Sequence, residues 1–343
     1  MPLTAGIVGL PNVGKSTLFN AITNSQVEAA NYPFATIDPN VGVVEVHDPR
    51  VDKLVEIFKP KRTIYTTFEF TDIAGLVRGA SKGEGLGNKF LANIRETDAI
   101  CEVVRCFKNS DITHVEGSID PIRDVETINI ELVFADLDTV DKRIGKIEKK
   151  AQTGDKDSKI ELEILQRIKE TLEQEKPIRT MDFTKEEMVI VRQFNFLTIK
   201  PLIYVANMGE EDITNPEGNE YYVALKNYAD KEGCQVVPIS AQIESELAGL
   251  EPEDRAVFME DLGLEVSGLD QLIHAAYALL GLKTFFTVGS DEVRAWTFKD
   301  GMTAPEMAGI IHTDFQKGFI KAETYSYDDL MTYGSEQACH EIF

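Results

Sequence analysis

Short apolar runs rich in β-branched residues alternate with helical patterns along most of the chain. These runs occupy residues 4–8, 41–46, 65–71, 99–104, 202–206 and 235–240. Short buried strands that alternate with helices are typical of a mostly parallel sheet with helices on both faces. The pattern therefore predicts an α/β fold with a doubly wound sheet.

A longer helical pattern interrupts this alternation between about residues 125 and 200. Its apolar positions are three and four apart, at Ile130, Val133, Leu137, Val140, Ile144 and Ile147. A Thr-Gly-Asp turn at 153–155 separates them from a second apolar stripe. We therefore expect a helical coiled-coil hairpin over residues 125–199. A further helix is expected to begin at Thr184, where Glu187 completes a capping box.

The segment that follows Gly281 predicts a small separate α+β module. Gly281 suits the end of an amphipathic helix. The module's pattern is strand, strand, helix and strand over residues 284–288, 294–298, 304–315 and 319–325. The expected domains are residues 1–124 with 200–281, the insertion at 125–199, and the module at 282–343.

Composition places the chain among folded globular proteins and narrows where it acts. Hydrophobic residues make up 43% and charged residues 27% of its 343 positions. It contains no run of 18 apolar residues and no leader-like N-terminal pattern, so we expect a cytoplasmic protein without a membrane span. The formal net charge of −23 opposes non-specific binding to DNA.

Residues 9–16 read GLPNVGKS and match the phosphate-binding pattern G-x-x-x-x-G-K-[ST] between a strand and a helix. Glycine lets backbone N–H groups curl around phosphates, and the helix N-terminus adds positive potential. Lys15 is expected to contact the transferred phosphate, and Ser16 to bind Mg²⁺. The alternative, a glycine turn that only joins strand to helix, needs no lysine. The predicted phosphate-binding residues are Asn12, Val13, Gly14, Lys15, Ser16 and Thr17.

Two later segments have the order of nucleotide-responsive loops. Thr36 precedes the second strand and is a candidate ligand of Mg²⁺ in a first mobile loop. Asp72 ends the third strand and is expected to hold Mg²⁺ through water, while the N–H of Gly75 contacts the γ-phosphate. The glycine-rich run over 75–90 is expected to form a second mobile loop.

These motifs resemble the Obg group of translation-factor-class P-loop GTPases, and most closely its Obg-like ATPase (YchF-type) subfamily, over essentially the whole chain. The resemblance implies a nucleotide-binding domain, a coiled-coil insertion and a C-terminal TGS module of β-grasp type. It also implies association with ribosomes. Such modules normally continue with further strands beyond the point reached at residues 341–343, so an incomplete module is expected.

The base-reading motif differs from that of guanine-specific relatives. They carry N-K-x-D, whereas this chain has Asn207, Met208, Gly209 and Glu210. Loss of the lysine and aspartate contacts removes much of the advantage of guanine, and the resembled subfamily prefers ATP. Ser240 and Ala241 are expected to complete the base site. The alternative is that another segment reads the base.

Position 76 carries leucine where many GTPases use a glutamine to orient the attacking water. His114, in a polar loop after the fourth strand, is therefore the candidate for positioning water or stabilising charge. The alternative is a solvent-exposed loop histidine. In similar enzymes Asn12 is linked to a K⁺ ion that replaces an arginine finger, so K⁺ is a candidate second cofactor.

Basic residues gather at one end of the insertion, at Lys142, Arg143, Lys146, Lys149 and Lys150. They predict either a solvated helix face or a contact to ribosomal RNA. The sequence thus favours a monomeric, Mg²⁺-dependent ATPase that switches partner affinity on the ribosome. The alternatives are a GTPase with relaxed base specificity and a nucleotide-gated ribosome-binding regulator with little intrinsic turnover.

Overall fold

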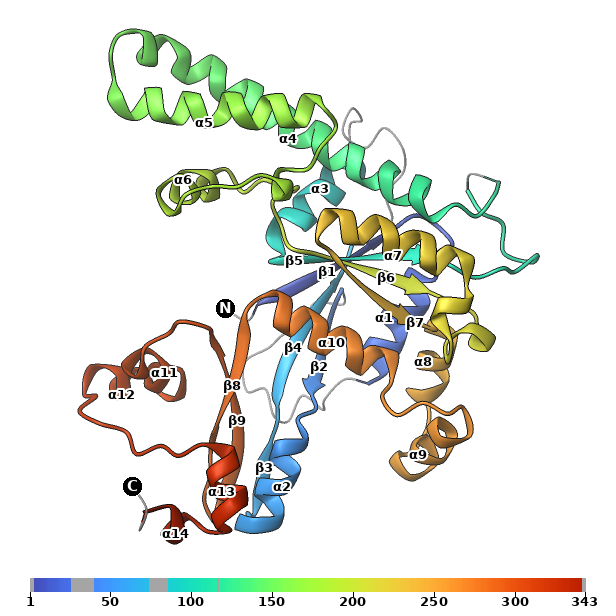
Figure 1. The fold of residues 1–343 in the computed structure, drawn as a ribbon, viewed down its shortest axis with the longest axis vertical. Helices are drawn as coiled ribbons and strands as arrows, with labels where there is room; N and C mark the ends of the chain where they lie inside the picture. Colours follow the sequence, from blue (N-terminus) through green and yellow to red (C-terminus); the bar gives the residue numbers. More distant parts are fainter. Residues whose placement is uncertain (1–2, 26–39, 74–85, 116, 341–343) are drawn as a thin grey trace. The chain divides into compact units, whose positions relative to one another are not determined.

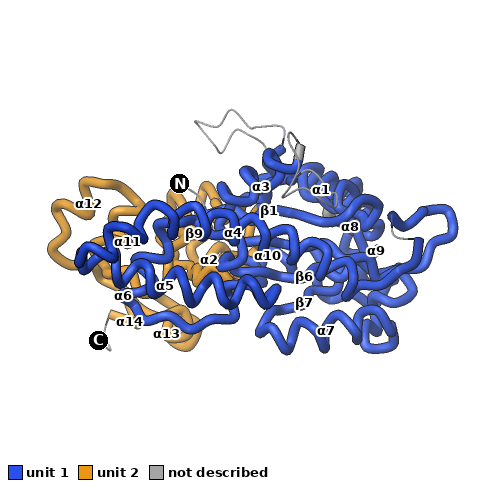
Figure 2. Tube along the Cα trace, turned by 90° about the horizontal axis from the view of Figure 1, so that it is seen from above, with its two compact units in different colours: residues 1–44, 69–276 blue, residues 45–68, 277–343 orange. Residues whose placement is uncertain are grey.

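A computed structural model describes residues 3–25, 40–73, 86–115 and 117–340. The chain divides into two compact units, shown in Figure 2. Unit 1 contains residues 1–44 and 69–276, and unit 2 contains residues 45–68 and 277–343.

A six-stranded sheet has the order β2-β4-β1-β5-β6-β7 (Figure 1). Its strands are β1 (Thr4–Gly9), β2 (Val41–Val46), β4 (Thr66–Asp72), β5 (Ala99–Arg105), β6 (Leu202–Asn207) and β7 (Gln235–Ile239). β1 pairs in parallel with β4 and β5, and the pairs β5–β6 and β6–β7 are parallel too. Every residue of β5 and β6 is buried, as expected for strands covered on both faces. The predicted α/β doubly wound sheet is confirmed.

Helices α1 (Lys15–Asn24), α3 (Leu86–Glu96) and α7 (Glu220–Glu232) lie in connections between strands of this sheet. Helices α8 (Ala241–Leu247), α9 (Pro252–Asp261) and α10 (Gly268–Leu279) follow its last strand, β7. Asn219 begins α7, because its side-chain oxygen accepts from the N–H groups of Tyr221 and Tyr222. Gly281 follows α10 with φ of 65°, as its predicted capping role requires.

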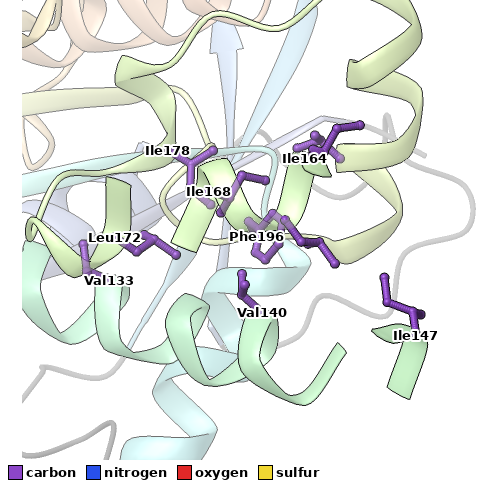
Figure 3. Close-up of a cluster of buried hydrophobic side chains, with 10 residues drawn as sticks. Val133, Val140, Ile147, Ile164, Ile168, Leu172, Ile178 and Phe196 are labelled. Atoms are coloured by element: carbon purple, nitrogen blue, oxygen red, sulfur yellow. The ribbon is translucent and has the colours of Figure 1, made fainter. Parts of the chain in front are cut away.

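The long insertion is a helical hairpin of α4 (Pro121–Gln152) and α5 (Lys156–Glu173). Asp120 and Asp155 cap the two helices, and Gly154 makes the turn with φ of 101°. Figure 3 shows apolar side chains of α4 and α5 directed toward one another, including Val133, Val140 and Ile168. The predicted stripe thus forms this core, and the hairpin is confirmed.

Short elements close the hairpin and return the chain to β6. They are η2 (Ile178–Thr180), α6 (Lys185–Val191) and η3 (Arg192–Phe194). The predicted capping box of Thr184 and Glu187 is present. The carboxylate of Asp136, on α4, accepts from the N–H groups of Leu197 and Thr198 and from the Thr198 hydroxyl at 2.7–2.9 Å. This fully buried carboxylate therefore fixes the return segment against α4.

Unit 2 contains a three-stranded sheet of order β3-β9-β8, formed by β3 (Arg62–Ile64), β8 (Leu282–Thr287) and β9 (Glu292–Lys299). β9 pairs in parallel with β3 and antiparallel with β8. Its core contains Val51 and Leu54 of α2 (Pro49–Phe58), Val293 and Ala295 of β9, and Leu330 of α13 (Tyr327–Tyr333). The remaining helices are α11 (Ala304–Ile311), α12 (Thr313–Lys317) and α14 (Glu336–His340).

Two features of unit 2 differ from the sequence prediction. The strand expected over 319–325 is wrong: this segment forms no helix or strand, and Ile320 is 91% exposed. Alternating residues favour a strand only where another strand is available to pair with them. The single helix expected over 304–315 is interrupted at His312, whose extended backbone ends α11 and begins α12.

The boundaries of the compact units and of the predicted domains also differ. Residues 45–68, assigned above to the sheet domain, cluster with the C-terminal residues. Their sequence pattern is an ordinary helix and strand, and it contains no signal for a partner more than two hundred residues away. The three-domain division stays a prediction.

We predict that Asp136→Ala lowers the free energy of unfolding by about 3 kcal/mol, because it leaves buried donors without an acceptor. Asp138→Ala is the control, because Asp138 lies on the exposed side of α4, where its carboxylate pairs with Lys142. This control is expected to cost less than about 1 kcal/mol. Urea denaturation measures both. Equal costs for the two variants would contradict the role of Asp136.

Candidate nucleotide-binding site

The loop between β1 and α1 has the backbone that the phosphate-binding motif requires. Gly14 precedes α1 with φ of 95°, and Asn12 has φ of 64°. A Cβ at Gly14 would lie 2.1 Å from Nδ2 of Asn207. Glycine is therefore required at position 14 both for the backbone conformation and for the close approach of Asn207.

Asn207 connects two loops at the carboxyl edge of the sheet. Its Nδ2 donates to the carbonyl of Val13 at 2.8 Å, and its Oδ1 accepts from the N–H of Ala241 at 3.0 Å. Its side chain thus holds the phosphate loop and the loop after β7 together. The sequence predicts a contact between Asn207 and the base, whereas the structure places the side chain between these two loops.

Lys15, the first residue of α1, faces Asp72, the last residue of β4. The ammonium of Lys15 is buried and forms an ion pair with the carboxylate of Asp72. The pairing of β1 with β4 produces this proximity, because Ile7 lies opposite Asp72 in the register. Ser16 is exposed in the first turn of α1. Of the groups predicted for phosphate and for Mg²⁺, Lys15, Ser16 and Asp72 therefore line the same cavity.

A cavity of about 1150 Å³ extends from this loop to the loops after β6 and β7. Most predicted site residues line it, namely Asn12, Gly14, Lys15, Ser16, Thr17, Asp72, Asn207, Met208, Glu210, Ser240 and Ala241. Val13 is buried beside it and contributes a carbonyl to Asn207. Thr36, Gly75 and Leu76 lie outside the described residues.

The base-side wall combines an apolar residue with acidic ones. Met208 is 2% exposed, and its N–H donates to the carbonyl of Ile239 at 2.8 Å. Glu210 begins the short 3₁₀ turn Glu210–Asp212. Ser240 caps α8 by accepting from the N–H of Ile243, so its hydroxyl contributes to the shape of this loop.

The polar loop predicted that His114 approaches the phosphate side of the site, whereas the structure buries it against α4. It is 6% exposed and does not line the cavity; its Nε2 is 2.7 Å from Oδ2 of Asp124 on α4. The alternative of a solvent-exposed histidine is therefore wrong. Burial raises the pKa of Asp124, while the hydrogen bond from His114 opposes that rise. The role of His114 in hydrolysis stays a prediction.

Arg105, at the end of β5, supports one wall of the cavity, a role that the sequence motifs did not indicate. Its guanidinium is buried and donates to the carbonyls of Phe107, Asn109 and Ile112 at 3.0–3.2 Å. All three of these residues line the cavity. The available signal was an arginine at the end of a mostly apolar strand, because a buried cation needs several hydrogen-bond acceptors.

A second buried group supports the base-side helix. Glu244 of α8 is 3% exposed, and its Oε1 accepts from the N–H of Gly268, where α10 begins, at 2.8 Å. Burial raises the pKa of Glu244 to about 7, although the hydrogen bonds from Gly268 and Leu269 oppose this rise. The attachment of α10 to α8 therefore includes a carboxyl group that titrates near neutrality.

The fold and the site are those of a P-loop nucleoside triphosphatase. A parallel strand leads through a phosphate-type loop to a helix that begins with a lysine and a serine, and an aspartate lies on the adjacent strand. Two family models match the chain. The model described as "50S ribosome-binding GTPase" matches residues 4–136, and YchF-GTPase_C, described as "Protein of unknown function (DUF933)", matches residues 282–342.

Individual relatives identify the family more closely. The chain is 59% identical to "Ribosome-binding ATPase YchF" of Bacillus subtilis, over 99% of this chain and 93% of the relative. Identity to the protein of that name from Escherichia coli O157:H7 is 54%, with the same coverage. The solved structure titled "Structure of the Schizosaccharomyces pombe YchF GTPase" is 42% identical, with a TM-score of 0.89 over 99% of this chain and 92% of that one. The chain belongs to the YchF family.

None of the helices in the described part of the chain is long and apolar enough to cross a membrane.

We predict that Gly14→Ala weakens ATP binding by at least about tenfold, because the new methyl group displaces Asn207. Gly154→Ala is a matched control: Gly154 has a similar φ of 101°, yet nothing lies within 4 Å of an added Cβ. Both variants carry the strain of a left-handed residue. Calorimetric titration should show normal ATP affinity for Gly154→Ala. Equal affinities in both variants would show that the approach of Asn207 is unimportant.

We predict a pH-dependent difference in stability between the wild type and Glu244→Gln. The folded protein holds the proton of Glu244 up to about pH 7, whereas the unfolded chain releases it near pH 4.5. The wild type therefore loses up to about 3 kcal/mol relative to the variant as pH rises across this interval. Urea denaturation at pH 5 and pH 8 measures the change, with exposed Glu246→Gln as control. A pH-independent difference would refute the assignment.

Proposed function

We propose that this chain is a Mg²⁺-dependent ATPase that acts in the cytoplasm as a nucleotide-state switch on the ribosome. The observation that carries the proposal is a single cavity whose phosphate end holds Lys15 and Asp72 and whose base end holds Met208 in place of lysine. The names of the YchF relatives, which describe ribosome-binding ATPases, agree with this interpretation. We expect the chain to act as a monomer.

The phosphate end has the groups that a triphosphate with Mg²⁺ needs. The Ser16 hydroxyl and the Asp72 carboxylate supply oxygen ligands of the kind that Mg²⁺ prefers, and Thr36 is the predicted third. Mg²⁺ bound there would neutralise charge that develops on the phosphates. Lys15 would bind the β- and γ-phosphates, and the Gly75 N–H would donate to the γ-phosphate. The ion pair of Lys15 with Asp72 supports this assignment, because it places both groups beside the loop.

The water-activating step is assigned to His114, since Leu76 cannot hydrogen-bond to water. K⁺ near Asn12 is the candidate for the remaining positive charge. The side-chain amide of Asn12 donates to the carbonyl of Thr113 at 3.1 Å, so the residue beside His114 lies at the phosphate loop. Replacing K⁺ by Na⁺ is expected to lower turnover.

ATP is favoured at the base end because the cavity wall lacks the lysine and the aspartate that recognise guanine. Guanine recognition needs an aspartate that accepts from two guanine N–H groups and a lysine over the ring. Met208 and Glu210 line the cavity at the corresponding positions. Met208 is apolar, and the fold uses its backbone N–H to pair with Ile239. Unpaired polar groups on guanine would therefore raise its cost of binding.

The hairpin is the proposed ribosome-contacting element. Lys142 and Arg143 are paired with Asp138 and Glu161. Lys146, Lys149 and Lys150 of α4 form no ion pair within 4 Å among the described residues, although the charge of Lys150 helps to lower the pKa of Asp155. Cations gathered toward the end of a long helix support a contact to phosphate groups of ribosomal RNA.

We predict that Met208→Lys combined with Glu210→Asp shifts base preference from ATP toward GTP by at least about tenfold, because it restores the guanine contacts. Competition of ATP against GTP for the site, in wild type and variant, measures the shift. Glu211→Asp is the control, because it makes the same carboxylate change one position later. A wild type that prefers GTP would favour the relaxed-specificity GTPase instead.

The function is tested by ATP turnover with and without 50S ribosomal subunits. We expect slow turnover alone and at least about tenfold stimulation by the subunit, as partner-activated switches show. Nucleotide binding without turnover under either condition would favour the nucleotide-gated regulator. Turnover that is fast alone and unaffected by ribosomal subunits would contradict the switch. His114→Ala should lower turnover while ATP still binds.

A further inference from the structure

The loop that leads from β5 to α4 is attached at three places. Arg105 holds its first part through three carbonyls. Its middle contacts the phosphate loop, because Nδ2 of Asn12 donates to the carbonyl of Thr113. The next residue, His114, contacts Asp124 in the first turn of α4. Adjacent residues of this loop therefore contact the nucleotide site and the helical hairpin.

The contact between His114 and Asp124 is buried. The side chains are 3% and 4% exposed, and Nε2 of His114 lies 2.7 Å from Oδ2 of Asp124. The other carboxylate oxygen accepts from Arg123 at 3.2 Å. The imidazole is thus directed to α4, whereas Asn109 and Ile112 of the same loop line the nucleotide cavity.

We propose that Asp124 is a positioning residue that holds His114 away from the nucleotide at rest, and that displacement of the start of α4 releases the imidazole toward the γ-phosphate. This inference rests on the proposed function, in which His114 acts on the attacking water. The trigger would be ribosome binding. Because α4 is the first helix of the proposed ribosome-contacting hairpin and carries Asp124, a displacement of the hairpin would act on the contact between His114 and Asp124.

Two physical points support a holding role. A buried, charge-assisted hydrogen bond keeps its groups together except in a small fraction of molecules, and turnover follows that fraction. The backbone next to His114 already contacts the phosphate loop, because the carbonyl of Thr113 accepts from Nδ2 of Asn12 at 3.1 Å. We expect release to be a local rotation at His114, while Arg105 keeps the preceding part of the loop, residues 107–112, in place.

The competing role for Asp124 is to orient His114 for catalysis, as the carboxylate of a histidine dyad does. The two roles predict opposite results. A holding carboxylate slows basal turnover, so its removal raises the rate. An orienting carboxylate is needed in the reacting state, so its removal lowers the rate to that of a protein without the histidine.

Asp124→Asn tests the roles by turnover. We expect basal ATP turnover about fivefold above wild type and a correspondingly smaller stimulation by 50S subunits, because more molecules carry a released histidine. Adding His114→Ala to this variant should abolish the gain. Glu126→Gln, an exposed carboxylate on the same turn of α4, should leave both rates unchanged. Turnover that is unchanged or lower in Asp124→Asn overturns the proposal.

A second measurement needs no hydrolysis. Carbethoxylation by diethyl pyrocarbonate, followed by mass spectrometry, compares His114 with His47 and His312, whose side chains are 60% and 61% exposed. In nucleotide-free wild type, His114 should react at least about tenfold more slowly than these, and Asp124→Asn should bring it within about threefold. Equal rates in the wild type overturn the holding contact, even if the variant does not fold.

The two measurements separate the inference from the proposed function. If Asp124→Asn exposes His114 while no variant hydrolyses ATP, Asp124 is a positioning residue and the ATPase assignment fails. If ATP is hydrolysed and stimulated but His114 is equally reactive in wild type and variant, the ATPase stands and the holding contact is wrong.

Discussion

The two hydrogen bonds of the Asn207 side chain are the constraint on which the nucleotide site depends. They join the carbonyl of Val13 to the N–H of Ala241, across loops more than two hundred residues apart in sequence. The approach is close enough that Gly14 has no room for a Cβ. The loops after β1 and β7, at the two ends of the cavity, are therefore joined directly through one side chain, which is the frame of the site.

Parallel pairing brings these loops together. β1, β5, β6 and β7 are neighbours in the sheet, so the loops at their carboxyl ends share one edge. Arg105 fixes the loop after β5, Asn207 fixes those after β1 and β7, and Glu244 attaches α8 to the start of α10. Each of these polar side chains is buried, and each forms hydrogen bonds with backbone groups of the loops or helix ends. Those backbone groups have no partner within a strand, so the side chains satisfy them.

Local signals explain what could be predicted from the sequence. The phosphate loop is a contiguous motif between a strand and a helix, and the hairpin follows from an apolar repeat with a glycine turn. Contacts that leave no regular pattern in the sequence explain the rest. The burial of His114 depends on Asp124, the role of Arg105 depends on the path of its loop, and the grouping of residues 45–68 depends on C-terminal partners. The strand expected over 319–325 failed for the same reason, because no described strand pairs with it.

Binding of Mg²⁺-tripolyphosphate and Mg²⁺-ATP to Asn207→Ala, measured by calorimetry, tests most directly whether Asn207 supports the frame or reads the base. Tripolyphosphate has phosphates and no base. If Asn207 holds the phosphate loop, the variant loses affinity for both ligands by a similar factor, about tenfold or more for the loss of two buried hydrogen bonds. If the variant binds tripolyphosphate normally and loses affinity only for ATP, Asn207 acts on the base, and the frame is not the constraint that holds the site.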